Sequence, residues 1–147
     1  MKRLVLGIGN LLLGDEGVGI HVVRALEGME LPPDTDVLDG GTGGLHLIGL
    51  IEGYERIVMV DATLDEQPAG TVRHLKPRYA SDFPTLMSAH EIGLRDMIAA
   101  MHLTGHVPDI DLLVVTASNV GRLGLSLTPP VAEAIPEVIR RIKLLLH

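Results

Sequence analysis

The segment from residue 4 to residue 19 constrains the fold more than any other part of this chain. It begins as an apolar run and passes into a Gly-x-Gly turn formed by Gly7 and Gly9. This pattern is typical of a buried parallel strand that turns sharply into a helix, and such turns usually bind phosphate because a helix N-terminus favours negative charge. Here the turn carries two anions of its own, Asp15 and Glu16, which repel a phosphate. The segment therefore favours a metal cation over an anionic ligand.

Length and composition indicate a single domain spanning residues 1–147. A chain of 147 residues is long enough to build one core, and 46% apolar with only 2% aromatic residues predicts that aliphatic side chains fill it. The sequence contains no cysteine, which excludes disulfides, zinc-thiolate sites and a cysteine nucleophile. A cytoplasmic location is the expectation for such a chain.

Charge and hydropathy argue against two classes of partner. The net charge is −7, no basic cluster is longer than Arg140-Arg141, and few aromatic residues are present to stack on bases, so nucleic acid is not expected. The N-terminal apolar run stops at Gly7 and is too short for a signal peptide or a membrane span, so no membrane partner is expected either. The oligomeric state is left open.

Apolar runs alternate with segments of helical periodicity along the chain, which predicts an α/β fold. We expect a three-layer sandwich, in which helices flank a mostly parallel twisted sheet of about five strands. Asp15 is the expected N-cap of the first helix, and Thr128 the expected cap of the last. The expected strands are 3–8, 35–38, 56–61, 71–75 at an edge of the sheet, and 111–116; the expected helices are 16–29, 45–53, one starting near residue 90, and 131–146.

Four side chains follow or end these expected elements at positions that should converge. Glu16 follows the first strand, Asp39 ends the second, Asp61 ends the third, and His90 opens a later helix. In open parallel sheets, ligands bind beyond the carboxyl ends of the strands, where the strand order reverses. We therefore expect all four residues at this carboxyl edge of the sheet.

Glu16, Asp61 and His90 form the first candidate site. Two carboxylates and one imidazole are a mixed oxygen and nitrogen ligand set, suited to a divalent ion such as Ni²⁺ or Zn²⁺ with coordination positions left open. The alternative is structural: Glu16 complements a helix dipole, Asp61 caps a turn and His90 lies on the surface.

Other candidates are weaker. Gly7-x-Gly9 with Asp39 imitates a dinucleotide-binding fingerprint, but Leu12 stands where its third glycine belongs. The glycine-rich loop 40–44 either docks a peptide backbone or makes a tight strand-to-helix turn. His46 is the best substitute ligand. For the remaining histidines a structural or solvated role is favoured, namely for His21, His74, His102, His106 and His147.

As a set, these motifs resemble those of the nickel-iron hydrogenase maturation endopeptidases. The most specific motif is Gly-Ile-Gly-Asn-x-x-x-Gly-Asp-Glu-Gly-x-Gly, at residues 7–19. Later motifs follow in the family's order and nearly span the chain, at 39–42, 60–62, 88–94 and 124–129. The chain departs from the family's Gly-x-x-Pro-Glu-like pattern at 115–119, where it has Val-Thr-Ala-Ser-Asn.

The resemblance implies an endopeptidase that removes a C-terminal extension from a hydrogenase large-subunit precursor after nickel insertion. It places Glu16, Asp61 and His90 at the family's metal-contacting positions. The nickel ion would be supplied by the substrate, and an adventitious divalent metal could occupy the same site.

On this interpretation Glu16, Asp61 and His90 are the catalytic residues, and Asp39, Gly40, Gly41 and Thr42 support the substrate backbone. A water molecule attacks the peptide bond, activated either by the metal or by a carboxylate base, as in an aspartyl protease. The alternative function is a non-enzymatic, metal-dependent binding module or chaperone for the same precursor.

Overall fold

The computed structural model describes residues 2–42, 47–79, 82, 88–118 and 123–147, and within 88–95 it describes the helical backbone alone. Within these described residues, five strands and five helical segments follow one another. In order they are β1 (Arg3–Gly7), the 3-10 helix η1 (Gly14–Gly17), α1 (Val18–Leu26), β2 (Thr35–Asp39), α2 (Leu47–Ile51), β3 (Arg56–Thr63), β4 (Val72–Leu75), α3 (Ser88–Thr104), β5 (Asp109–Thr116) and α4 (Pro129–Leu145).

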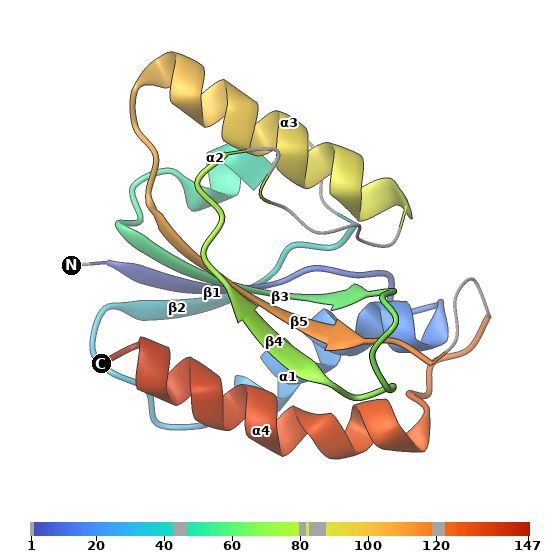
Figure 1. Cartoon of the computed structure of the whole chain (residues 1–147). Helices are drawn as coiled ribbons and strands as arrows, with labels where there is room; N and C mark the ends of the chain where they lie inside the picture. The colour runs from blue at the N-terminus through green and yellow to red at the C-terminus, as the bar shows by residue number, and fades with distance from the viewer. Residues whose placement is uncertain (1, 43–46, 80–81, 83–87, 119–122) are drawn as a thin grey trace.

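The strands form one sheet in the order β2-β1-β3-β5-β4. The pairs β1–β2, β1–β3 and β3–β5 are parallel, whereas β4 lies at an edge and runs antiparallel to β5. Helices α2 and α3 cover one face of the sheet, and α1 and α4 cover the other (Figure 1). The predicted three-layer α/β sandwich with a mostly parallel sheet is confirmed.

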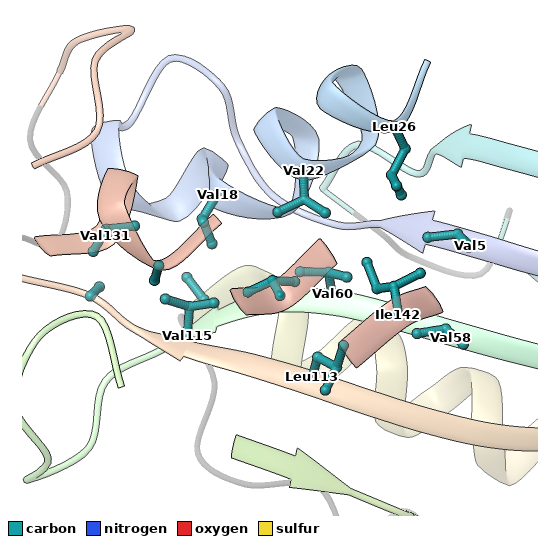
Figure 2. Close-up of a cluster of buried hydrophobic side chains, with 14 of the residues drawn as sticks. Val5, Val18, Val22, Leu26, Val58, Val60, Leu113, Val115, Val131 and Ile142 are labelled. Carbon is teal, nitrogen blue, oxygen red and sulfur yellow. The ribbon is translucent and has the colours of Figure 1, made fainter. Parts of the chain in front are cut away.

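Side chains alternate between the two cores along the central strands. Leu4, Leu6 and Met59 point into the core beneath α2 and α3, whereas Val5 and Val58 point into the core beneath α1 and α4. Figure 2 shows this second core, where valines of both helices meet the sheet. Because both faces of these strands are buried, they appear in the sequence as uninterrupted apolar runs.

The first helix differs from the expected 16–29. A 3-10 turn over Gly14–Gly17 comes first, and α1 then runs over Val18–Leu26. The helix ends early because Glu27 is extended (ψ 128°) and Gly28 takes a positive φ of 83°. The residue before the helix is Gly17, so the prediction that Asp15 is the N-cap is wrong.

Other elements also differ from their expected bounds by one or more residues at their ends. The third strand continues to Thr63, so Asp61 lies within it, two residues before its end. The last central strand starts at Asp109, and α3 starts at Ser88. No helix among the described residues has both the length and the apolar character required to cross a membrane.

Candidate active site

The strand order reverses between β1 and β3, since the chain goes from β1 to β2 on one side and then to β3 on the other. Beyond Gly7, the amide of Ile8 donates a hydrogen bond to the carbonyl oxygen of Val60 (2.9 Å), which joins the two strands at their ends. The turn η1 packs against β3 at this point. This is the topological switch point at which α/β sheets bind ligands.

Gly19 lets the first turn of α1 lie directly over the switch point. A Cβ atom at this position would lie 2.4 Å from the carbonyl oxygens of both Ile8 and Val60. Any side chain would push α1, and η1 before it, away from β1 and β3. Glycine at 19 therefore positions Glu16 against the third strand.

Glu16 lies in η1 and is 6% exposed. Within the described part of the chain, no hydrogen bond or ion pair reaches its carboxylate. Its backbone is packed closely as well, because a Cβ on Gly9 (φ 154°) would lie 2.1 Å from the Glu16 carbonyl oxygen. A carboxylate that accepts no such hydrogen bond keeps its oxygen lone pairs available to a cation.

Asp61 is fully buried near the carboxyl end of β3. One carboxylate oxygen, Oδ1, accepts a hydrogen bond from the amide of Ala62 at 2.7 Å. Alternation along β3 puts Asp61 on the same face as Met59, which is the face that α3 covers. Asp61 is thus oriented toward the helix that carries His90.

His90 lies in the first turn of α3, and its side chain is outside the described residues. Figure 1 shows that α3 begins at the end of the molecule where β3 and β5 end. The backbone therefore places Glu16, Asp61 and the start of α3 at one edge of the sheet. Among the described side chains, no group of three or more histidine and acidic residues is positioned to hold a metal ion.

Asp39 ends β2 as expected, and its loop packs against the Gly7–Gly9 turn. Asp39 Oδ1 accepts a hydrogen bond from the amide of Gly41 (2.8 Å), and the amide of Gly40 donates to the Gly7 carbonyl oxygen (2.8 Å). A Cβ on Gly40 would lie 3.0 Å from Leu6 Cδ1 and 3.2 Å from the Gly7 carbonyl oxygen, so the loop packs closely against β1 at this residue. In residues 39–42 the loop is a tight turn, with Asp39 and Thr42 exposed. The rest of the loop and His46 lie outside the described residues.

Asp15 has a role that the sequence did not indicate. Its carboxylate is 1% exposed and accepts hydrogen bonds from the amide and hydroxyl of Thr128 (both 2.8 Å) and from the amide of Ser118 (2.9 Å). Thr128 is the residue before α4, as predicted, but its hydroxyl bonds to Asp15 instead of capping the helix. Asp15 thereby joins η1 to the segments that follow β5.

Thr116 closes the carboxyl edge beside Asp61. It is 1% exposed, and its hydroxyl donates to Asp65 Oδ1 at 2.9 Å. Asp65 also forms an ion pair with Arg73 of β4 at 3.0 Å. Of the two roles open for the polar end of the last strand, lining a pocket or closing it, Thr116 takes the second.

A second cluster that the sequence analysis missed lies toward the opposite end of β5. Asp111 is fully buried and pairs with His74 Nε2 (2.7 Å), Arg56 (3.1 Å) and Lys76 (3.3 Å). Burial alone would raise the pKa of Asp111, but hydrogen bonds from His74, Lys76 and Arg56 outweigh it and hold the pKa below its ordinary value. The sequence signal of this cluster is an aspartate at the start of an otherwise apolar strand.

Two other histidines have structural contacts. Burial lowers the pKa of His21, and the nearby backbone of Leu125 offsets only part of this effect. His102 stacks on Tyr79 with ring centroids 5.0 Å apart, and its Nε2 is hydrogen-bonded to the Arg78 carbonyl oxygen at 2.6 Å.

Comparisons with known proteins agree with one another. A family model described as hydrogenase maturation protease matches residues 20–143. The hydrogenase 2 maturation protease of Escherichia coli K12 is 34% identical over 145 residues, covering 97% of this chain and 88% of that protein. The hydrogenase expression/formation protein HupD of Rhodobacter capsulatus is 36% identical over 153 residues, covering 97% of this chain and 71% of that protein.

Solved structures are similar over the whole fold. The hydrogenase maturating endopeptidase HybD from E. coli superposes with a TM-score of 0.91 at 33% identity, covering 99% of this chain and 92% of that one. The [NiFe] hydrogenase maturation protease HybD from Thermococcus kodakarensis gives a TM-score of 0.82 at 27% identity, with both chains covered completely.

Proposed function

This chain belongs to the hydrogenase maturation protease family, and we propose that it removes the C-terminal extension of a nickel-iron hydrogenase large-subunit precursor after nickel has been inserted. That it is a peptidase follows from its relatives and argues against a non-enzymatic binding module. We propose the identity of the substrate, its nickel requirement and the residues that recognise both. The proposed location is the cytoplasm, as the cysteine-free sequence predicts.

The environment of Glu16 carries this proposal. Glu16 as a whole residue is 6% exposed, and its carboxylate has no hydrogen-bond or ion-pair partner among the described residues. It lies at the switch point of the sheet and adjoins the strand that holds Asp61. Oxygen donors of this kind suit a divalent cation such as nickel, and a histidine from α3 would add a nitrogen donor. The donor set is therefore compatible with a nickel ion presented by a substrate.

Each residue of the site has a proposed role. Glu16, Asp61 and His90 approach the nickel held by the precursor and fix its C-terminal segment over the carboxyl edge. Asp39, Gly40, Gly41 and Thr42 lie at the same edge and support the substrate backbone.

In the hydrolysis, the oxygen of a water molecule attacks the carbonyl carbon of the scissile peptide bond, and the leaving amine takes up a proton. Either the substrate's metal or a carboxylate acting as general base activates this water, and the second route is that of an aspartyl protease. An adventitious divalent ion could bind the same ligands in the absence of substrate.

Intact-mass spectrometry of a cognate precursor tests the proposal. The precursor is incubated, nickel-loaded and nickel-free, with the protein and with its Asp61→Asn variant. We expect one discrete C-terminal loss, only from the nickel-loaded form and only with the unmodified protein. If both forms were cut, the peptidase would remain and the nickel requirement would be wrong; an uncut nickel-loaded precursor would contradict the proposed substrate.

A further inference from the structure

Three leucines are strongly exposed on two segments beside the candidate active site. Leu12, Leu123 and Leu125 are 61%, 82% and 60% exposed. The two segments are joined through Gly124, whose amide donates to the Leu12 carbonyl oxygen (2.9 Å) and whose carbonyl oxygen accepts from the amide of Gly14 (2.8 Å). We call these three side chains the leucine surface.

The leucine surface adjoins the candidate active site. A hollow of about 250 Å³ lies next to it, lined by Gly14, Asp15 and residues 123–128. Asp15 immediately precedes Glu16 in η1, so the wall of the hollow continues into the turn that carries the candidate catalytic carboxylate. A polypeptide that crosses the carboxyl edge beside η1 passes next to this hollow.

The segment 123–128 is held in place by contacts from three directions. Gly124 pairs with the 12–14 segment, His21 of α1 lies against the backbone of Leu125, and Asp15 accepts two hydrogen bonds from Thr128. Its leucines are therefore presented on an ordered backbone. Exposed apolar side chains on an ordered surface are typical of binding sites, since little conformational entropy is lost on binding.

We propose that the leucine surface binds apolar side chains of the polypeptide substrate next to its scissile bond. A peptidase must draw its substrate across the residues that cut it, and this surface flanks that path. Residues 11–14 and 123–128 contain no charged side chain, so the surface suits an apolar segment rather than a charged one. The inference rests on the proposed function, because it assumes that Glu16 belongs to the active site.

The test uses the full chain carrying Leu123→Ser together with Leu125→Ser, and separately Leu12→Ser. Leu103→Ser is the matched control, because Leu103 is 90% exposed but lies near the C-terminal end of α3. Initial cleavage rates are measured against the concentration of nickel-loaded precursor, and thermal melting checks that each variant is folded.

We expect the double variant to raise KM about tenfold with kcat within about twofold, because lost substrate contacts away from the reacting atoms remove uniform binding. Leu12→Ser should shift KM in the same direction, and Leu103→Ser should change neither parameter. An unchanged KM in folded leucine variants overturns the inference and leaves the proposed function standing.

Two further outcomes would also contradict the proposal that the leucine surface binds the substrate. If the unmodified protein leaves the nickel-loaded precursor intact, the proposed function fails and this inference fails with it. If light scattering shows a dimer of the unmodified protein that the double variant cannot form, while KM stays unchanged, the surface binds a second copy of this chain instead.

Discussion

Asp15 and Glu16 carry the same chemical group one residue apart, yet their surroundings differ. The Asp15 carboxylate accepts hydrogen bonds from Thr128 and Ser118, whereas none from the described residues reaches Glu16. A carboxylate whose lone pairs are occupied by donors is a poor metal ligand, while one without such donors can bind a cation. The local environment thus separates a structural aspartate from a candidate catalytic glutamate.

Asp61→Asn keeps the size of the side chain and removes its charge. We expect the fold to persist and precursor cleavage to fall by at least about 100-fold, since a positioned acid–base group contributes roughly 10²–10⁴ in rate. Initial rates by intact-mass spectrometry and a circular dichroism spectrum measure the two effects. Full activity in a folded Asp61→Asn variant would show that the assigned role is wrong.

Asp15→Ala should lower the free energy of unfolding by about 3 kcal/mol, because it removes the hydrogen bonds from Ser118 and Thr128 and leaves their amides without this acceptor. Urea denaturation gives the value. Glu133→Ala, at an exposed position in α4, is the control and should change stability by less than about 0.5 kcal/mol. Equal effects in the two variants would mean that Asp15 does not hold η1 in place.

At the scale of elements, the contact of α1 with β1 and β3 depends on the absence of one side chain. Helical glycine normally costs about 1 kcal/mol relative to alanine, so a helix gains by replacing it. At Gly19 the alanine Cβ would instead lie 2.4 Å from two backbone oxygens, which cannot move without shifting a strand. The tertiary contact therefore reverses the ordinary preference.

Gly19→Ala should destabilise the protein by more than about 2 kcal/mol and reduce cleavage, because α1 and η1 must move. Gly49→Ala in α2 is a matched control, since nothing lies within 4 Å of a Cβ at Gly49. That variant should be neutral or stabilised by up to about 1 kcal/mol. Chemical denaturation measures the free energy of unfolding of both variants. A Gly19→Ala variant as stable as Gly49→Ala would refute the close approach of Gly19 to the carbonyl oxygens of Ile8 and Val60.

Asp111 links three strands, since its partners Arg56 and His74 come from β3 and β4. Its pKa is lowered by folding, so its contribution to stability is present above the unfolded-state pKa of about 3.9 and is lost as pH falls through the folded-state pKa. Asp111→Asn should therefore cost about 3 kcal/mol near pH 7 and progressively less below about pH 4. Urea denaturation at several pH values measures this difference, and a difference that does not vary with pH would contradict the ion-pair role.

At the scale of the whole molecule, the candidate site lies at the open carboxyl edge of a three-layer sandwich. The chain has no cysteine to hold nickel itself, and its proposed ligands leave coordination positions for groups of the substrate. A precursor that carries the metal offers the protease a contact that a metal-free precursor lacks. This difference in binding is a physical basis for cleaving only the metal-loaded substrate.

We therefore expect no hydrolysis of casein or of short generic peptides, with or without added divalent metal. Gel electrophoresis and mass spectrometry of the incubated substrates check this expectation. Casein cleavage that disappears in a Glu16→Gln variant would contradict substrate-delivered selectivity, because it would place a general protease activity at the same site.

Much of the architecture was predictable because strands buried on both faces are continuous apolar runs. Once β1 and β3 are parallel strands, their carboxyl ends must share an edge, so residues that follow or end them converge there. Glu16 and Asp61 could be assigned to that edge without coordinates for this reason. The side-chain arrangement around His90, by contrast, stays a prediction.

By itself, the sequence determined the alternation of strands and helices, the family motifs and the edge of the sheet where the acidic residues gather, because these follow from local periodicity and from parallel pairing. Only the tertiary structure decided the roles of Asp15 and Asp111. Asp15 accepts a hydrogen bond from Thr128, which is 113 positions away in the sequence, and Asp111 pairs with Arg56, which is 55 positions away. Local spacing specifies which face of an element a side chain occupies. The partner it finds there depends on how distant segments pack, and that decides whether a buried carboxylate is a structural link or a ligand.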